Sequence, residues 1–237
     1  FLFAHALTEP KGASDRWLGY NAPEASMDTK AVKTSGGWII NGRKHYISNG
    51  YDAGLYVVYA NTSPEKGMMQ GTSSFIVPRG TEGFNIARCN ETVGCRFMNN
   101  GELEFVDCFV PDDQLLAEGD SLSKAGIYFR PGKIIQASKN LGVGQAALEK
   151  TSNFVQTYKR GGRLLLKHQI VASRIADMAT RVAAVRSLVM QAAKAVDIKS
   201  QDAEALCNMS KVFASQEILH VCQNAMELHG GMGAMLD

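Results

Sequence analysis

The chain contains 237 residues, of which 45% are hydrophobic and 20% are charged. This composition is typical of a globular protein with one large domain or two smaller ones, and its apolar runs are too short for a membrane-spanning helix. The 25 Lys and Arg residues against 23 Asp and Glu residues give a net charge of +2, which argues against a dedicated nucleic-acid-binding protein because such proteins carry a larger basic excess.

The cysteines and histidines argue against a metal site and against a disulfide framework. Neither a CxxC pair nor a metal-ligand spacing occurs among the five cysteines and five histidines. An odd number of free thiols indicates a reducing compartment. The chain opens on Phe1 without an initiator Met or a signal peptide, and it stops at Asp237 just after a Gly-rich turn. We therefore expect it to be an internal piece of a longer protein.

The composition of the chain changes near residue 120. All six prolines and both tryptophans lie at or before Pro131. Residues 1–120 contain 10 Lys and Arg against 15 Asp and Glu, whereas residues 121–237 contain 15 against 8. We predict a domain boundary at this point, with one domain over 1–120 and a second over 121–237.

The first domain is predicted to consist of short strands. Residues 38–47 hold an Asn-Gly pair between two strand-like runs, which predicts a hairpin turn because both residues tolerate positive φ. Further strands are expected over 55–60 and 74–77. Charged and apolar residues alternate over 102–107, which indicates a strand with one wet face. Several short strands at this spacing predict a small β-barrel or sandwich.

The second domain is predicted to consist of long helices. Apolar residues recur at steps of three and four over 171–196, which predicts one amphipathic helix. A second helix is expected over 202–228, capped by its first residue, and a third over 131–158, with its proline in the first turn. Gly142 and Gly144 lower the helix propensity of this third segment, which indicates a close helix contact there. Three such helices with short connections predict an antiparallel bundle.

Two segments of the first domain carry polar groups of the kind that bind ligands. Residues 8–15 form a turn with backbone N–H groups beside Gly12, and such groups can hold an anionic or carbonyl oxygen. Alternation places Tyr46 and Ser48 on one face of a strand, where an aromatic ring beside a hydroxyl suits a planar heteroaromatic ligand. Taken alone, each segment favours a plainer interpretation. Residues 8–15 would then be an ordinary polar loop, and Tyr46 with Ser48 would be a half-buried cross-strand pair.

The second domain has a basic corner and a Gly-rich turn. Two lysines and two arginines between 159 and 167 surround a Gly-Gly pair and could bind a phosphate, although a solvated charged face is commoner. Residues 230–233 follow a helix rather than a strand, so we interpret them as a helix stop and not as a dinucleotide-binding fingerprint. The absence of a Gly-x-Ser-x-Gly elbow and of a Walker-type loop argues against hydrolases and nucleotidases.

The order of these motifs resembles the flavin-binding middle domain and the C-terminal helical domain of acyl-CoA dehydrogenases. The matching segments are 6–10, 12–15, 38–44, 46–50, 110–111, 115–116, Arg160, 168–169, 176–178 and 230–233. The resemblance covers nearly the whole chain. It implies an α+β fold in which a small β-barrel domain precedes an antiparallel helical bundle, without the family's N-terminal helical domain and the end of its last domain.

The resemblance also implies an FAD site built from three groups of residues. The opening strand and loop would line the flavin, largely through backbone groups: His5, Ala6, Leu7, Thr8, Gly12 and Ser14. The second group would lie against the isoalloxazine ring, with the Ser48 hydroxyl at flavin N5: Tyr46, Ile47 and Ser48. The third group would hold the FAD of a neighbouring subunit: Arg160, His168, Gln169, Glu227, Gly230 and Gly231. A cofactor shared between subunits implies an oligomer, in this family usually a homotetramer.

The activity implied by the resemblance is α,β-dehydrogenation of an acyl-CoA thioester. A carboxylate would remove the α proton while the β hydrogen leaves as hydride to flavin N5, and an electron-transfer flavoprotein would then take the electrons. Ser14, Arg130 and Lys133 would bind the substrate. The family's base is commonly a Glu, expected here beyond Asp237, and the alternative family position is occupied by Gly132, so the base is unassigned.

Two other functions stay open at this point. The short Arg-Gly-Gly turn that begins at Arg160 resembles the turn of nitroalkane oxidases, which keeps a flavin oxidase or monooxygenase reacting directly with oxygen as an alternative. A scaffold that binds FAD or CoA without dehydrogenation is the third. For the enzyme, the resemblance implies the cytoplasm of a bacterium or the mitochondrial matrix.

Overall fold

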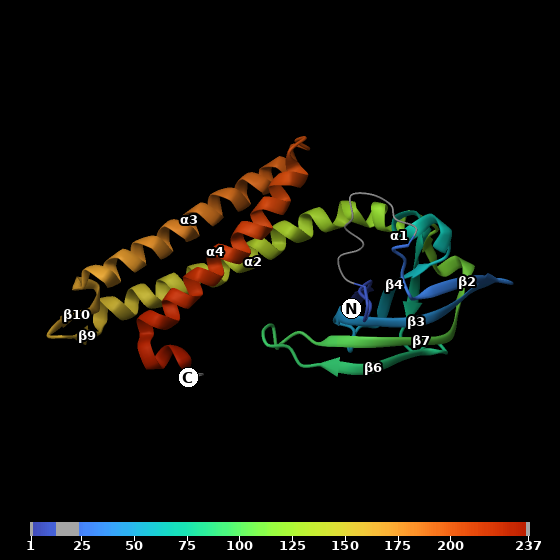
Figure 1. The fold of residues 1–237 in the computed structure, drawn as a ribbon, viewed down its shortest axis with the longest axis horizontal. Helices are drawn as coiled ribbons and strands as arrows, with labels where there is room; N and C mark the ends of the chain where they lie inside the picture. Colours follow the sequence, from blue (N-terminus) through green and yellow to red (C-terminus); the bar gives the residue numbers. More distant parts are fainter. Residues whose placement is uncertain (1, 13–23, 236–237) are drawn as a thin grey trace. The chain divides into compact units, whose positions relative to one another are not determined.

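The computed structural model describes residues 2–12 and 24–235. The chain divides into two compact units, Phe1–Ile127 and Tyr128–Asp237, the first built mainly of strands and the second of helices (Figure 1). We call them the β unit and the helical unit. No helix among the described residues is long and apolar enough to cross a membrane.

The β unit is one sheet of eight strands. The sheet order is β6-β7-β3-β2-β4-β5-β8, and β1 pairs in parallel with β4. The strands are β1 (Phe3–Ala6), β2 (Lys30–Thr34), β3 (Gly37–Ser48), β4 (Leu55–Asn61), β5 (Thr72–Pro78), β6 (Phe84–Asn90), β7 (Asn100–Pro111) and β8 (Leu115–Ala117). Short helices lie between β4 and β5, namely η2 (Pro64–Lys66) and α1 (Gly67–Gly71), and between β7 and β8, namely η3 (Asp112–Gln114). The α+β class is confirmed, but within the described part of the chain the sheet is open and does not close into a barrel.

The predicted hairpin at the Asn-Gly pair is wrong. Strand β3 runs straight through Asn41 and Gly42, and the turn lies instead at Gly36, which joins β2 to β3 with a φ of 76°. Gly42 has a φ of 149° and sits at a register shift where residues 40–42 of β3 oppose residues 105–108 of β7, so the extra residue of this β-bulge lies in β7 and not in the Asn-Gly pair. Asn41 is also engaged across the sheet, because its side chain bonds both the side chain and the backbone N–H of Asp107, at 3.0 and 2.8 Å.

A second bulge, whose extra residue lies in β3, exposes Tyr46. The register against β7 shifts again between Lys44 and Ile47, both of which are buried, and Tyr46 between them has a φ of 59°. The extra residue of a bulge lets two inward-facing side chains lie three positions apart instead of two. Tyr46 is consequently 61% exposed, although it lies in the middle of a strand-like run.

The core of the β unit follows the predicted alternation of β7 up to Phe105 and then shifts by one residue at the bulge, where Val106 and Asp107 are both exposed. The side chains of Leu103, Phe105, Cys108 and Val110 are buried, while their neighbours are half-buried or exposed. Phe105 stacks on Phe84 with ring centroids 4.9 Å apart. Burial raises the pKa of the Cys108 thiol to about 11, so this cysteine is an inert core residue, as expected from its apolar surroundings.

The helical unit contains three long helices. They are α2 (Ser121–Thr157), α3 (Gln169–Asp197) and α4 (Ala203–His229). The strands β9 (Lys159–Arg160) and β10 (Arg163–Leu164) with η4 (Leu165–Lys167) connect α2 to α3, and η5 (Gly230–Ala234) follows α4. The predicted stripe on α3 is confirmed, because its members from Val171 to Val196 are buried at helical spacing, except for Ile175 and Val196, which are half-buried.

The predicted start of the first long helix at Pro131 is wrong. Helix α2 begins at Ser121 and carries Pro131 in its interior. The Ser121 hydroxyl donates to the Thr72 carbonyl at 2.6 Å, and Leu122 and Ala125 are buried. Packing of this first turn within the β unit extends the helix through Pro131, a residue that lacks a backbone donor.

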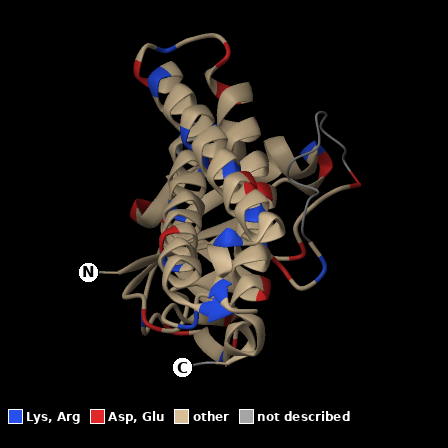
Figure 2. Ribbon diagram, turned by 90° about the vertical axis from the view of Figure 1, so that its left-hand side faces the viewer, with Lys and Arg blue, Asp and Glu red and all other residues tan. Residues whose placement is uncertain are grey.

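The three helices are held by packing and by ion pairs. A side chain added at Gly144 of α2 would place its Cβ 2.5 Å from Ile218 Cδ1 of α4, whereas nothing lies within 4 Å of the equivalent atom at Gly142. The predicted close contact is therefore confirmed at Gly144 and wrong at Gly142. Charges of both signs lie along the helices (Figure 2), and Arg174 pairs with Glu227 at 2.6 Å.

Candidate functional site

A pocket of about 390 Å³ lies where β1 and the end of β3 come together. We call it the β3 pocket. Its lining residues are Leu2, Phe3, His5, Thr8, Tyr46, Ile47, Ser48 and Asn49. Residues from two of the three predicted groups therefore line one cavity, although they are separated by about forty positions in the chain.

The β3 pocket owes its shape to a backbone contact and a bulge. The His45 N–H donates to the Thr8 carbonyl at 2.8 Å, which fixes the segment after β1 to β3. The Tyr46 ring stacks on the His45 ring with centroids 3.9 Å apart and planes 6° apart. The pocket thus presents a flat aromatic surface beside the Ser48 hydroxyl.

The other predicted residues of the opening segment have different positions. Ala6 and Leu7 are buried, so only their backbone groups can reach a ligand. Gly12 lies outside the pocket lining, and its carbonyl accepts a long bond of 3.4 Å from the Glu9 N–H. Ser14 lies outside the described residues.

A buried ion pair that the sequence analysis missed joins two residues close in the chain to the lining of the β3 pocket, since Glu9 follows Thr8 and Lys44 lies two positions before Tyr46. Lys44 Nζ is 2.7 Å from Glu9 Oε1, and the two side chains are 0% and 4% exposed. Burial by itself would raise the pKa of Glu9, but the charge of Lys44 and hydrogen bonds from Lys44 and Thr29 hold this pKa below its usual value. A lysine in the middle of a strand that is otherwise apolar on its inner face was the signal available in the sequence.

The Glu9 carboxylate predicts a loss of stability in acid. A carboxylate whose pKa is lowered by folding stabilises the folded state above its unfolded pKa, near 4.5, and this contribution is lost as the pH falls through the lower folded value. Below pH 4.5, we expect the urea concentration at the unfolding midpoint to decrease more steeply with falling pH for the wild type than for the double variant Glu9→Gln, Lys44→Met. Urea unfolding at several pH values measures these midpoints. If they decreased equally with falling pH in the two proteins, the stabilising role of the Glu9 carboxylate would be contradicted.

A second pocket, of about 580 Å³, lies in the helical unit at the end of α4. We call it the α4 pocket. It brings together four of the predicted residues, Arg160, Glu227, Gly230 and Gly231. Its other lining residues are Phe154, Tyr158, Leu165, Leu228, His229, Met232 and Met235.

One wall of the α4 pocket is a column of stacked flat groups. The Arg160 guanidinium lies 4.2 Å from the centre of the Tyr158 ring, Tyr158 stacks on Phe154 at 4.8 Å, and Phe154 stacks on His229 at 4.4 Å. A guanidinium held on an aromatic face keeps its charge available to an anion. This arrangement is suited to a ligand with a flat ring and a phosphate group.

The remaining predicted residues lie at or beyond the edge of this pocket. His168 is hydrogen-bonded to the Arg160 carbonyl at 3.1 Å but does not line the cavity, and Gln169 begins α3. Lys133 is half-buried on α2, and the side chain of Arg130 lies outside the described residues.

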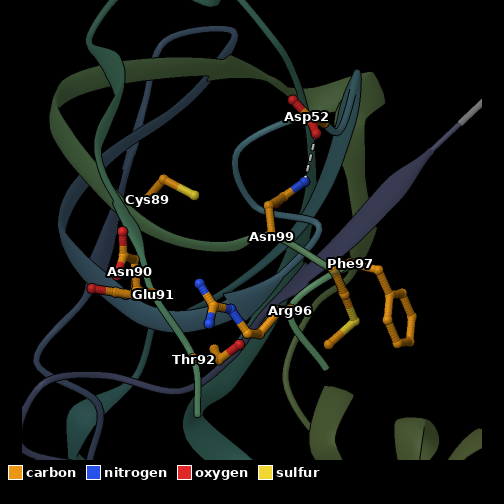
Figure 3. Close-up of a pocket in the computed structure, with 9 residues that line it drawn as sticks. Asp52, Cys89, Asn90, Glu91, Thr92, Arg96, Phe97 and Asn99 are labelled. Atoms are coloured by element: carbon orange, nitrogen blue, oxygen red, sulfur yellow. Dashed lines mark hydrogen bonds between the residues drawn. The ribbon is translucent and has the colours of Figure 1, made fainter. Parts of the chain in front are cut away.

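A third pocket, of about 340 Å³, contains none of the predicted residues. It lies at the loop between β6 and β7 and is lined by residues 89–92, 96–99 and Asp52 (Figure 3). The Asn99 amide donates to the Asp52 carboxylate at 2.6 Å, and its carbonyl oxygen accepts from the Tyr51 N–H at 2.9 Å. Asn99 thereby braces the turn that follows Ser48 in the β3 pocket.

Metal ligands are not gathered at either pocket. Within residues 2–12 and 24–235, no group of three or more His, Cys, Asp or Glu side chains could hold a metal ion.

The comparisons with known proteins identify the family. The family model for the acyl-CoA dehydrogenase middle domain matches residues 4–108, and the model for the acyl-CoA dehydrogenase C-terminal domain matches residues 126–237. The sheet and the helices are therefore the middle and C-terminal domains of this class of enzyme. The chain belongs to the acyl-CoA dehydrogenase family, which is FAD-dependent.

Individual relatives support this assignment. An acyl-CoA dehydrogenase of Bacillus subtilis is 35% identical over 237 residues, which are 100% of this chain and 60% of that protein. The structure of butyryl-CoA dehydrogenase from Megasphaera elsdenii is 30% identical with a TM-score of 0.89, covering 99% of this chain and 59% of that one. An FAD complex of PigA is 27% identical with a TM-score of 0.87, covering 99% of this chain and 59% of that one. The chain thus spans about three fifths of the length of these relatives.

Proposed function

We propose that the complete protein is an FAD-dependent dehydrogenase of acyl-CoA thioesters. The observation that carries this proposal is the β3 pocket, in which Thr8, Tyr46 and Ser48 surround one cavity with a flat aromatic surface and a hydroxyl. These groups fit a planar heteroaromatic ring. When bound, FAD would supply a two-electron acceptor for a hydride from the substrate.

The chain's own residues have distinct roles in this proposal. The Ser48 hydroxyl would donate a hydrogen bond to the ring, and the Tyr46 ring, whose other face stacks on His45, would exclude water from one side of it. The segment before Glu9 contributes backbone groups, because Ala6 and Leu7 are buried. A site closed to water strengthens each of these hydrogen bonds. Ser14, Arg130 and Lys133 are proposed to bind the acyl-CoA.

The α4 pocket is proposed to hold the distal part of FAD from a neighbouring subunit. The Arg160 guanidinium, fixed on Tyr158, is suited to a phosphate oxygen, and Gly230 and Gly231 allow close approach of a backbone to the ligand. The His168 ring is hydrogen-bonded to the Arg160 carbonyl, and Glu227 lines the cavity. Gln169, the residue after His168, is proposed to contact the same FAD. This assignment entails an oligomer, proposed to be a homotetramer, with an electron-transfer flavoprotein as the electron acceptor. The bacterial cytoplasm or the mitochondrial matrix is the proposed location.

The replacement Ser48→Ala tests the site. Loss of the hydroxyl removes one hydrogen bond to the ring, so we expect reduction of bound FAD by acyl-CoA to slow by about five- to tenfold, given that such a bond contributes about 1–1.5 kcal/mol. Stopped-flow spectroscopy of the complete protein measures this rate, and Ser74→Ala, a buried serine of β5 outside the pocket, is the control. An unchanged reduction rate would remove Ser48 from the site, and a protein that takes up no FAD would refute the proposed function.

The short turn between β9 and β10 favours one alternative, a flavin oxidase. Gly161 and Gly162 have φ angles of 59° and 79° and make this turn tight beside Arg160, as in the nitroalkane oxidases that it resembles. Reoxidation of the reduced protein by air, compared with reoxidation by an electron-transfer flavoprotein, distinguishes the two. Rapid turnover with oxygen alone would favour the oxidase.

A further inference from the structure

The Glu9–Lys44 ion pair has no counterpart elsewhere in the described part of the β unit. Its other ion pairs include Lys33–Asp112 and Arg43–Glu104, and each of these contains at least one solvent-exposed partner. Both partners of Glu9–Lys44 are buried. Two apolar side chains of similar volume commonly stabilise a fold as well as a buried ion pair does. Stability alone is therefore a weak explanation for two buried charges in the segments that supply Thr8 and Tyr46 to the β3 pocket.

The ion pair joins three segments of the chain. The two carboxylate oxygens of Glu9 accept from the backbone N–H groups of Asp28 and Thr29, at 2.7 and 3.0 Å, just before β2. Lys44 donates from β3 to the Leu7 carbonyl at 3.3 Å. Each carboxylate oxygen of Glu9 thus has a donor, so the charge is satisfied without water.

The contact with Leu7 controls the direction of a peptide group at the β3 pocket. Lys44 holds the Leu7 carbonyl, and the neighbouring His45 N–H holds the Thr8 carbonyl at 2.8 Å. In a trans peptide the N–H points opposite to the carbonyl. The N–H of Thr8 is therefore turned away from Lys44, at a residue that lines the pocket.

Lys44 also lies next to the bulge that forms the aromatic wall. It is the last buried residue of β3 before His45 and Tyr46, whose rings stack on each other. A cation anchored by Glu9 at this point fixes the strand from which both rings project. The same side chain therefore determines the position of both sides of the pocket.

We propose that Glu9 and Lys44 are positioning residues that preorganise the β3 pocket for the flavin ring, by fixing the Leu7 and Thr8 peptide groups against the bulge of β3. This inference rests on the proposed function, since it takes the flavin to be the ligand of that pocket. Preorganisation raises affinity because the ordering of the binding groups is completed before the ligand arrives.

The double variant Glu9→Gln, Lys44→Met tests the proposal without leaving a buried charge unpaired. Loss of a charged donor to the Leu7 carbonyl is expected to weaken FAD binding by about tenfold or more, measured by titrating the complete apoprotein with FAD. The control Glu104→Gln replaces the carboxylate partner of Arg43, the residue before Lys44 in β3, in a pair whose arginine is 60% exposed, and its FAD affinity is expected to stay within about twofold of the wild type. Wild-type affinity in the double variant would overturn the proposal.

Hydrogen exchange of the wild-type apoprotein gives a test that does not depend on the folding of a variant. We expect the backbone N–H groups of Asp28, Thr29 and His45 to be protected before FAD is added, because they already donate to the Glu9 carboxylate and to the Thr8 carbonyl. Protection that arises only on addition of FAD would overturn preorganisation. A wild-type protein that shows no FAD binding at all would instead refute the proposed function, so the two failures are distinguishable.

Discussion

Replacing Glu9 with glutamine is expected to lower the free energy of unfolding of the β unit by about 3–5 kcal/mol, the usual effect of removing one partner of a buried ion pair. Lys44 would then lie in the core with its charge uncompensated, at a side chain that is 0% exposed. Urea unfolding followed by tryptophan fluorescence measures this loss in the right unit, because both tryptophans of the chain lie within its first 38 residues and Trp38 is buried in the sheet.

The matched control for this prediction is again Glu104→Gln. Glu104 pairs with Arg43 between β3 and β7 at the surface, where an ion pair contributes about 0–1 kcal/mol. Adding Lys44→Met to Glu9→Gln is expected to recover much of the lost stability, because no charge is then left buried. If the single replacements at Glu9 and Glu104 cost the same, the buried pair would have no special energetic role.

Periodic patterns predicted the parts of the fold that depend on burial of one face. The stripe on α3 and the alternation in β7 are confirmed because both reflect a simple choice between core and solvent along a regular element. The predicted domain boundary lies near residue 120, and the two compact units meet between Ile127 and Tyr128.

Local turn and helix signals failed where tertiary contacts outweighed them. The Asn-Gly pair at Gly42 predicted a hairpin, yet pairing with β2 on one side and β7 on the other keeps β3 extended through it, opposite a bulge in β7. Pro131 predicted a helix start, yet the burial of Leu122 and Ala125 extends α2 to Ser121. In both cases a local preference worth about 1–3 kcal/mol competes with packing of comparable or greater strength.

The candidate site was partly accessible to sequence analysis. Motif order predicted a common site for Thr8, Tyr46 and Ser48, and these residues line one pocket; their role toward FAD stays a prediction. The Glu9–Lys44 pair was missed because a sequence does not show directly that a charged residue is buried. In addition, each residue lies in a motif, 6–10 or 38–44, whose interpretation depended on other residues of that motif.

Two glycines of α2 are expected to respond in opposite directions to alanine. Gly142→Ala should stabilise the helical unit by about 0.5–1 kcal/mol, because alanine is the better helix former and nothing lies within 4 Å of the new Cβ. Gly144→Ala should destabilise it by up to about 2 kcal/mol, because the cost of overpacking, about 1–3 kcal/mol, exceeds the same gain in helix propensity when the new Cβ lies 2.5 Å from Ile218 Cδ1. Urea unfolding followed by far-ultraviolet circular dichroism reports on this unit, since its long helices dominate that signal.

A compensating change tests whether the contact between α2 and α4 is the cause. Ile218→Val removes the Cδ1 atom that the new Cβ of Gly144→Ala would meet, and by itself it should cost about 0.5–1.5 kcal/mol. Because the two positions are in contact, we expect the double variant to be more stable than the sum of the single effects predicts. Strict additivity, or equal responses of Gly142 and Gly144 to alanine, would show that the helices separate easily at this point and that the close approach does not determine how α2 packs on α4.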